Sequence, residues 1–560
     1  MTARLPFPLV DEISRHCLQD GTPETVHIEV HLPGRLHHEG LRTAFHQALA
    51  RHPRVLVRQL PPRWWHRHYT WQLAPAPDVD PVAFPPPGPD ALTRARTRAL
   101  TDCPPLDAAP PVRLEVIDPP HTTDAPQPTA PTGTVLLLTL HHTALDAPAG
   151  LRILATTADL YRETTQSGPT PPPPTPPPPT ARAPRQQARS EVRGERRGEG
   201  RTEAERAERA EPAERAQRVA PPAPAPLTPS TPSPPSALSV SSPPSPPSAL
   251  SVSSPPSPPS PAPSPYRPGP LTRPARLAPD HTATIAAPHR STPRSPRPGN
   301  GMLLAVLPLP ARPHHTHSTE HSPPSPHTVN DQLLVATHLM ATHWNALHDR
   351  PAAPVIVTMP IDDRPRGPHM PIGNGTRLIP VAFPPTPSRS TARPQAPTPT
   401  VTHLLHHTAT RTRALKSATP GPQLGFPSAA LTSLPLPVGA RRALTRALRA
   451  LAAPWTPTAL LSNIGRVPYP LDFGDTGGRA TAVWFSAPAR MPRGLSITTA
   501  TTRDGDRIHL ALRWSRALLD DAAAARLLAL FRTSLATTAS ATTPPPPVGS
   551  APRTEGGGTP

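Results

Sequence analysis

The pattern of hydrophobic and polar positions divides the chain into four parts. Hydrophobic residues recur with the period of a strand or a helix in residues 1–168 and again in residues 301–540. Residues 169–300 and 541–560 lack such a period. The two periodic parts predict two folded lobes, and the other two predict a disordered insert and a disordered tail.

In the first lobe, His27–Leu32 alternates hydrophobic and polar side chains, as a half-buried strand does. The spacing of Leu41, Phe45 and Leu49 places them on one face of a helix. Further elements are expected as strands at Trp64–Trp71, Val112–Ile117 and Val135–Leu140, and as a helix after Gly150, at Leu151–Glu163.

The second lobe repeats this alternation of strands and helices. Strands are expected at Met302–Leu309, Pro354–Ile361 and Asp506–Trp514, and helices at Thr328–Trp344, Ala440–Ala453 and Asp520–Leu535. Because strands alternate with helices in both lobes, we expect an α/β fold.

Proline is concentrated in the expected insert. The chain holds 98 prolines and only 3% aromatic residues. The insert contains the run PPPPTPPPPT and two copies of ALSVSSPPSPPS, which start at Ala237 and Ala249. Such a composition buries too little apolar surface to offset the entropy of ordering, so we expect disorder or polyproline II segments. Within it, Glu191–Arg218 alternates Glu and Arg, which predicts either a solvated helix or a charged flexible spacer.

The net charge of +19 suggests a nucleic-acid partner, but the distribution of basic residues argues against a specific one. Nearly all basic residues are arginines, since Lys416 is the only lysine. No basic stripe with interleaved aromatic residues is present, as a single-strand binder would need. We therefore expect no specific nucleic-acid site, and at most non-specific attraction through the insert.

Other sequence features concern metals and location. Cys17 and Cys103 lack the spacing of a metal or redox site, so we expect two reduced thiols and no metal. The sequence has no apolar stretch of the length of a signal peptide or a membrane span. These features predict a cytoplasmic protein that does not bind membranes, and we expect a monomer.

The strongest candidate for chemistry lies in the segment LLLTLHHTALDAPAG. A buried strand there delivers His141 and His142, and Asp146 follows. A neutral imidazole can remove a proton from an alcohol or an amine near pH 7, and a carboxylate can hold the loop. Three other HH pairs occur, at His37, His314 and His406, but none follows such a strand or has Asp at the same spacing. The pattern predicts an acyl-transfer enzyme, and two surface histidines at the end of a strand are the alternative.

The segment HHTALDAPAG resembles the HHxxxDG motif of the condensation-domain and chloramphenicol-acetyltransferase-like superfamily. This superfamily includes nonribosomal peptide condensation domains and polyketide-associated acyltransferases. Further segments agree in order along the ordered chain: ARHPRVLVR at Ala50, PLDAAPPVRLEVI at Pro105, TVNDQLLVA at Thr328, VTMPIDDRPR at Val357, IGNGTRLIP at Ile372, SNIGRVPYPLDFG at Ser462 and DGDRIHLALRW at Asp504.

The resemblance implies two chloramphenicol-acetyltransferase-like lobes in a V arrangement, interrupted here by the long Pro/Arg/Ser-rich insert. It implies that a tunnel between the lobes admits an acyl donor from one face and an acceptor from the other. His142 would be the general base, next to His141, and Asp146 would hold the loop through an ion pair with an arginine that the sequence does not single out. Residues expected to contact substrate are Gly150, Gly373, Asn374, Ser462, Asn463 and Gly465, although Ser462 and Asn463 are equally compatible with a turn.

The same resemblance implies partners. The donor would be an acyl-CoA or an acyl group on a phosphopantetheinyl carrier, with no permanently bound cofactor. The acceptor would be a small-molecule alcohol or amine of secondary metabolism, and an acyl or peptidyl carrier protein would be a partner. We expect a free-standing enzyme, because the sequence shows no adenylation or carrier-domain signature.

The chain departs from the motif at two positions. The glycine after Asp146 is Ala147, and if that glycine has a positive φ, alanine would be strained by about 1 kcal/mol or more. Pro148 follows and would stiffen the loop. The DFG sequence at Asp472 matches only part of the latch motif of plant acyltransferases. The alternative function is therefore a catalytically degenerate condensation-like module that binds a carrier protein or a synthetase.

Overall fold

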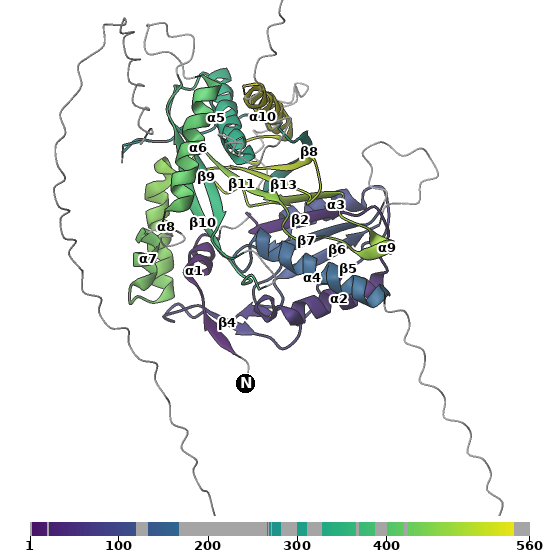
Figure 1. Cartoon of the computed structure of the whole chain (residues 1–560). Coiled ribbons are helices and arrows are strands. Elements are labelled where there is room, and N and C mark those ends of the chain that lie inside the picture. The colour runs from purple at the N-terminus through teal and green to yellow at the C-terminus, as the bar shows by residue number, and fades with distance from the viewer. Residues whose placement is uncertain are drawn as a thin grey trace, which may run out of the picture. The chain divides into compact units, whose positions relative to one another are not determined.

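The computed structural model describes two α/β lobes that belong to one compact unit (Figure 1). The described residues are 3–18, 22–118, 133–166, 266, 268–269, 271–281, 299–310, 327–365, 369–386, 400–418, 424 and 426–541. The predicted α/β class with two lobes is confirmed. Most of the expected insert, including the charged segment at 191–218, and the expected tail after residue 541 lie outside the described residues.

The first lobe is built on a five-stranded sheet with the order β12-β2-β7-β6-β5. Its strands are β2 (Thr25–His31), β5 (Val82–Ala83), β6 (Val112–Ile117), β7 (Val135–His141) and β12 (Ala482–Ser486). Its helices are α2 (His38–Arg51), α3 (Ala91–Thr101) and α4 (Ala147–Gln166). The bounds of β6 are those that the sequence predicts.

Strand β7 is hydrophobic at nearly every position because both of its faces are covered. Leu136 and Leu138 belong to the core that includes α2 and α4, whereas Val135 and Leu137 pack with the alanines of α3. All seven residues of β7 are buried, and β2 and β6 flank the strand in antiparallel register. A central, doubly covered strand gives the end of β7 a fixed position.

The second lobe is built on a six-stranded sheet with the order β10-β9-β11-β13-β14-β8. Its strands are β8 (Asn300–Pro308), β9 (Val355–Asp362), β10 (Thr376–Phe383), β11 (Ala459–Arg466), β13 (Leu495–Thr501) and β14 (Arg507–Ser515). Its helices α5 (Val329–Leu347), α6 (Val401–Ser417) and α10 (Asp521–Ser540) lie together beside this sheet (Figure 1). Helix α5 starts at the predicted cap, where Thr328 and Asp331 form a capping box.

A third, small sheet with the order β1-β4-β3 lies near the N-terminus. It consists of β1 (Arg4–Pro6), β3 (Val57–Gln59) and β4 (Thr70–Leu73). The strand predicted over the whole of Trp64–Trp71 is wrong in extent, because Trp64 and Trp65 are 71% and 51% exposed in a turn and only Trp71 lies in β4. Aromatic residues alone were an insufficient indicator of a strand here.

The remaining elements belong neither to the three sheets nor to the helices described with them. They are α1 (Leu9–His16), α7 (Phe426–Ser433), α8 (Val438–Ala452), α9 (Gly474–Gly477) and the 3-10 turns η1 (Pro53–Val55) and η2 (Ala453–Trp455). Although α1 and α8 are far apart in the sequence, they lie side by side (Figure 1).

A crossover from the second lobe completes the sheet of the first. After β11 the chain leaves its lobe, and β12 pairs with β2 at the edge of the five-stranded sheet before β13 returns. The Arg513 side chain on β14 adds a polar link, because it donates to the backbone oxygen of Thr25 on β2 at 2.6 Å. The two lobes are therefore joined by both main chain and side chains.

The second core includes residues that the sequence analysis placed in the insert. Ala275, Leu277 and Ala278 are buried in the core of the second lobe. The N–H of Ala275 donates to the Pro354 oxygen at 2.7 Å, and the indole of Trp344 donates to the Ala278 oxygen at 3.0 Å. Disorder is therefore the wrong expectation for this short stretch, which gains its order from contacts with distant residues rather than from local periodicity.

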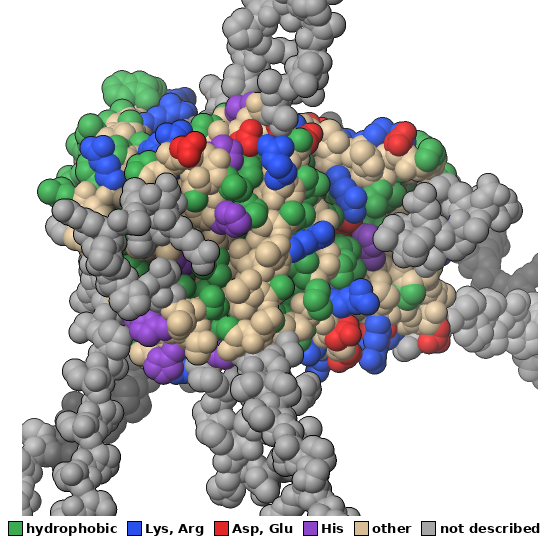
Figure 2. Space-filling view, turned by 90° about the horizontal axis from the view of Figure 1, so that it is seen from above, with side chains coloured by type: hydrophobic (Ala, Val, Ile, Leu, Met, Phe, Trp, Pro, Cys, Tyr) green, Lys and Arg blue, Asp and Glu red, His purple; other side chains and the backbone are tan. Residues whose placement is uncertain are grey.

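Figure 2 shows one face of the molecule, on which Lys and Arg side chains are scattered among other residues rather than gathered into one basic patch. Among the described helices, none combines the length and the hydropathy that a membrane span requires. Cys17 and Cys103 are both free thiols.

A buried ion pair fixes α1 against α8. Arg441 donates through Nε to Glu12 at 2.7 Å, and its other nitrogens donate to the backbone oxygens of Leu436 and Arg67. Burial raises the pKa of Glu12, and Arg441 opposes that rise. The charge of each partner is therefore tolerated only because the other is present.

Replacing Arg441 with Met should lower the free energy of unfolding by about 3–5 kcal/mol, because Glu12 is left as an unpaired buried charge. The double variant Arg441→Met with Glu12→Gln should recover part of this loss. Urea unfolding measures both variants. A double variant that is less stable than the single one would contradict this account of the pair.

Candidate active site

The end of β7 places the two histidines of the HHxxxD segment. Backbone hydrogen bonds hold the end of β7 to the segments on either side of it. The His141 N–H donates to the oxygen of Pro111, just before β6, at 3.0 Å, and the His142 N–H donates to the oxygen of Glu24, just before β2, at 2.7 Å. The chain then turns, and the N–H of Ala144 donates to the His141 oxygen at 2.9 Å. The backbone at His142 is therefore fixed by the sheet itself.

The His142 side chain lines a cavity of about 290 Å³ between the lobes. Its Nδ1 lies 3.3 Å from the Leu145 carbonyl oxygen, which can only accept, so Nδ1 carries the proton. Within the described residues, Nε2 has no hydrogen-bond partner. Burial lowers the pKa of His142 from its ordinary value of 6.5. The imidazole is therefore neutral at pH 7, with a free lone pair on Nε2, as a general base requires.

His141 occupies a different environment. Its side chain is only 6% exposed, and its Nδ1 accepts from the Thr143 N–H at 3.1 Å. Burial lowers the pKa of His141 to about 3. His141 is not among the residues that line the cavity beside His142. It therefore holds the turn as a neutral side chain.

Asp146 begins helix α4. Its Oδ1 accepts from the Ala149 N–H at 3.1 Å, which is the contact of a helix N-cap. Ala147 and Pro148 then form the first turn of α4, where proline removes no intrahelical hydrogen bond. Ala147 has no positive φ, because Asp349 is the only such non-glycine residue in the described part of the chain. The strain expected at Ala147 is therefore absent.

Arg364 is the arginine that pairs with Asp146. It follows β9 in the second lobe, and its Nη2 lies 3.0 and 2.8 Å from the two Asp146 oxygens. Its other contacts go to Asp362 and to the backbone oxygens of Pro371 and Gly373. Burial raises the pKa of Asp146, and the charge of Arg364 opposes that rise. The pair joins the histidine loop of one lobe to a loop of the other.

Gly373, Asn374 and Gly375 form that second loop. The Asn374 amide donates to the His142 and Thr143 oxygens at 3.1 and 2.9 Å, and Asn374 also lines the His142 cavity. The N–H of Gly375 donates to Asp146 at 2.9 Å. A Cβ at Gly375 would lie 2.2 Å from Nε of Arg364, so only glycine fits beside the ion pair. Gly373 has a φ of +138° and lies at a turn of this loop.

Ser462 and Asn463 line a second cavity, of about 410 Å³. Thr376 lines both this cavity and that of His142, so the two adjoin. Oδ1 of Asn463 accepts from the Gly465 N–H at 2.9 Å and from Thr499 at 3.1 Å, which fixes a bulge in β11. Gly465 has a φ of +72° there. The structure thus places Ser462 and Asn463 at the wall of this second cavity, with Gly465 behind them in the bulge, and none of the three lines the cavity of His142.

Gly150, in the first turns of α4, lines neither of the two cavities. A Cβ at this position would lie 2.6 Å from Ile28 and 2.7 Å from Leu140. Its role is therefore a close approach of α4 to the sheet, and nothing in the described contacts of Gly150 favours the expected role in substrate binding.

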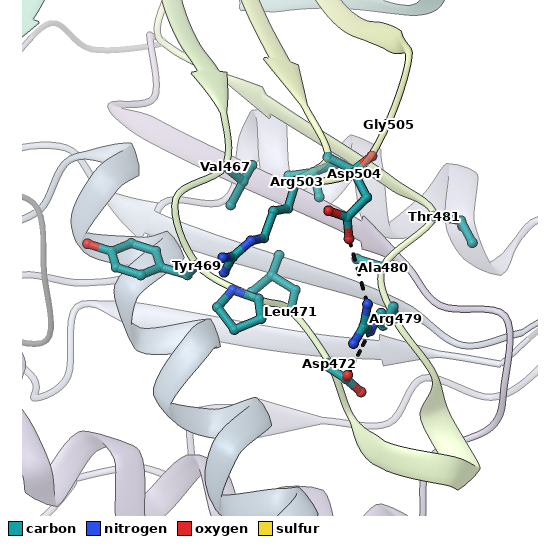
Figure 3. A pocket seen from close by; sticks show the side chains of 13 residues that line it. Val467, Tyr469, Leu471, Asp472, Arg479, Ala480, Thr481, Arg503, Asp504 and Gly505 are labelled. Atoms are coloured by element: carbon teal, nitrogen blue, oxygen red, sulfur yellow. Dashed lines mark hydrogen bonds and ion pairs between the residues drawn. The ribbon is translucent and has the colours of Figure 1, made fainter.

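The partial DFG motif lies at another cavity, of about 600 Å³, whose lining does not include His142 (Figure 3). Arg479 lies between Asp472 and Asp504 there, at 2.9 and 3.7 Å. Asp472 also accepts from the Gly474 N–H at 3.0 Å. The motif therefore forms a turn at the crossover and does not contact His142.

Two important residues near His142 were missed by sequence reasoning. Arg364 lies in a segment that carried the family resemblance, but nothing local distinguishes it from other arginines. Asp11 on α1 is buried and binds the Asn374 amide at 2.9 Å and the Trp71 indole at 2.8 Å. Burial raises the pKa of Asp11 to about 6. No sequence pattern around Asp11 indicates a buried carboxylate.

The fold is similar to that of solved condensation domains. A mutant of the starter condensation domain of rhizomide synthetase RzmA, in complex with C8-CoA, has a TM-score of 0.52 at 11% identity, covering 97% of this chain and 96% of that chain. The condensation domain of Monacolin K polyketide synthase MokA has a TM-score of 0.51 at 12% identity, covering 96% and 98%. The chain has the condensation-domain fold. Neither the family models nor the curated proteins include a match to its sequence.

Within the condensation-domain fold, the buried pair of Asp146 and Arg364 should be the main support of the histidine loop. Replacing Arg364 with Gln should cost about 3–5 kcal/mol in the free energy of unfolding, because Asp146 loses its buried partner. The control Arg479→Gln breaks a pair in which Arg479 is 73% exposed, and should cost less than about 1 kcal/mol. Thermal and urea unfolding compare the two variants. Equal losses would contradict the assigned importance of the Arg364 pair.

Proposed function

We propose that this protein is a condensation-like acyltransferase of secondary metabolism. It moves an acyl group from a thioester to an alcohol or an amine, with His142 as general base. The observation that carries the proposal is the neutral imidazole of His142 in a cavity lined by both lobes, with Nδ1 bonded to the Leu145 oxygen and Nε2 left free.

The chemistry follows from the state of that imidazole. Nε2 accepts the proton of the acceptor O–H or N–H while the acceptor oxygen or nitrogen attacks the thioester carbonyl. When the tetrahedral intermediate collapses, the C–S bond breaks and the proton passes from Nε2 to the leaving thiolate. The products are an ester or an amide and a free thiol, and no covalent enzyme intermediate is needed. General base action of this kind typically contributes about 100- to 10,000-fold.

Two adjoining cavities suit a reaction of two substrates. The cavity of His142 holds about 290 Å³ and the cavity of Ser462 and Asn463 about 410 Å³. The RzmA starter domain of similar fold carries C8-CoA, which supports an acyl-CoA or a phosphopantetheinyl carrier as the donor here. Both would enter as substrates rather than as resident cofactors, and an acyl or peptidyl carrier protein would be the partner in the second case.

The degenerate binding module loses its main support in the structure. It was motivated by Ala147, which lies in the first turn of α4 without a positive φ. Carrier-protein binding without product from any thioester and acceptor would still favour that function over catalysis.

The direct test is product mass spectrometry with octanoyl-CoA or octanoyl carrier protein and a panel of amines and alcohols. His142→Ala should reduce acyl transfer by at least about 100-fold, because the base is lost, while thermal stability changes little. The matched control is His406→Ala, since His406 belongs to another HH pair and is exposed on α6. Turnover that is unchanged in His142→Ala would remove the proposed role.

The pH dependence provides an independent test of His142. Burial lowers the pKa of His142 below 6.5, so the free base persists through neutral pH. We expect kcat/KM to be constant above pH 6.5 and to fall about tenfold per pH unit below the pKa of His142. The same shift means that the folded state loses stability as the pH falls below 6.5, because the unfolded chain binds the proton more readily. An acidic limb centred above pH 6.5 in the rate profile would contradict this assignment.

A further inference from the structure

The charged side chains that line the His142 cavity are all arginines. Arg449 from α8 and Arg490 and Arg493 from the loop after β12 line it. Among the described residues that line this cavity there is no Asp or Glu. A cavity whose charged groups are all cationic favours an anionic ligand over a neutral one.

Among the described residues, a carboxylate partner is found for only one of these three arginines. Arg490 forms an ion pair with Glu24. Arg449 donates to the backbone oxygen of Met491 at 3.3 Å, which leaves its charge uncompensated. The Nε of Arg493 is buried without a hydrogen bond, and no partner of Arg493 occurs among the described residues.

The electrostatics of Arg493 point in the same direction. Burial, together with the neighbouring charges of Arg490 and Arg449, lowers the pKa of Arg493 to about 10. Arg493 is still a cation at pH 7. A buried cation that is repelled by two others is destabilising unless an anion joins it.

The adjoining cavity provides a contrast within the same molecule. It is lined by Asp362 and Asp363, but each carboxylate binds an arginine, at 2.8 Å from Arg364 and 2.8 Å from Arg377. The lining there is otherwise largely apolar. Lys416 also lines this second cavity without an ion pair among the described residues, but its side chain is exposed to solvent. The His142 cavity differs in that its uncompensated cation, Arg493, is largely withdrawn from solvent.

We propose that Arg449 and Arg493 form an anion subsite that holds a phosphate or a carboxylate of one substrate. The planar guanidinium group suits either anion, because it can donate two parallel hydrogen bonds. The substrate identity rests on the proposed acyl transfer, whereas anion binding at the two arginines does not. Val10 and Ile13 of α1 form an apolar wall of the same cavity, so the ligand carries its anion on an apolar or neutral body that reaches His142.

The test measures binding by calorimetry, without turnover, with two matched pairs of probes. Octanoyl-phosphopantetheine and octanoyl-pantetheine differ in the phosphate, and octanoate and octanamide differ in the carboxylate. The wild-type protein should bind at least one anionic probe at least about tenfold more tightly than its neutral partner. The pair of probes that shows this preference identifies whether the subsite binds a phosphate or a carboxylate.

Arg493→Gln and Arg449→Gln should each reduce the preference, and the double variant should reduce it to within about twofold. The control Arg532→Gln, which removes an exposed charge from α10, should keep the wild-type preference. Arg493→Lys should keep part of it. Since Arg493 forms no hydrogen bond or ion pair among the described residues, Arg493→Gln should not lower thermal stability. A merely structural role of Arg493 would instead predict a loss of stability.

Two results would overturn the anion subsite: equal binding of both members of both pairs by the wild-type protein, or a preference that survives in the double variant. If the anion subsite is correct but the proposed acyl transfer is wrong, the binding and turnover results differ from both of these. In that case the preference for an anion would persist in the wild-type protein and disappear in the double variant, while no thioester and acceptor gives product.

Discussion

The buried ion pair between Asp146 and Arg364 is the constraint on which the candidate site depends. Asp146 caps helix α4 with one oxygen and binds Arg364 with both. Arg364 in turn holds the loop of Gly373 and Gly375 through its remaining nitrogens and its bulk. Since the two partners belong to different lobes, the pair fixes the histidine loop and the relation of the lobes in one contact.

That constraint explains how the His142 ring is oriented without a carboxylate of its own. The Nδ1 of His142 bonds to a backbone oxygen only three residues further along the chain, and the turn that presents this oxygen ends at Asp146. Asp146 therefore acts on His142 through the position of the loop rather than by direct contact. The cost of burying a carboxylate is offset by one arginine and two backbone N–H groups.

Much of the fold could be predicted from the sequence, because local patterns determine it. The hydrophobic run of β7 and the capping residues of α5 lie within the segments that they specify. The crossover strand β12 could not be predicted, because it is five residues long and its partner β2 lies more than 450 residues earlier in the sequence. The packing of Leu277 in the second core was missed for the same reason, since the sequence around it (RPARLAPD) has no strand or helix period.

The residues of the candidate site also fall into those that local sequence predicts and those that only the structure reveals. His142 was predicted because a strand, two imidazoles and a carboxylate are adjacent in the sequence, whereas Arg364 and Arg493 acquire their roles only from contacts, or the lack of them, in three dimensions. Gly150 lies within the motif, but its described surroundings are the packing residues Ile28 and Leu140. Motifs therefore located the chemistry, but the charges around it required the structure.

The central claim is that the fold holds His142 as a neutral imidazole with its proton on Nδ1 and a free Nε2. Nitrogen NMR of the histidine-labelled protein at pH 7 tests this directly, with the His142 signals assigned by their loss in His142→Ala. The account predicts a protonated Nδ1 and an unprotonated Nε2. A proton on Nε2, in either the other neutral tautomer or the imidazolium, would contradict it.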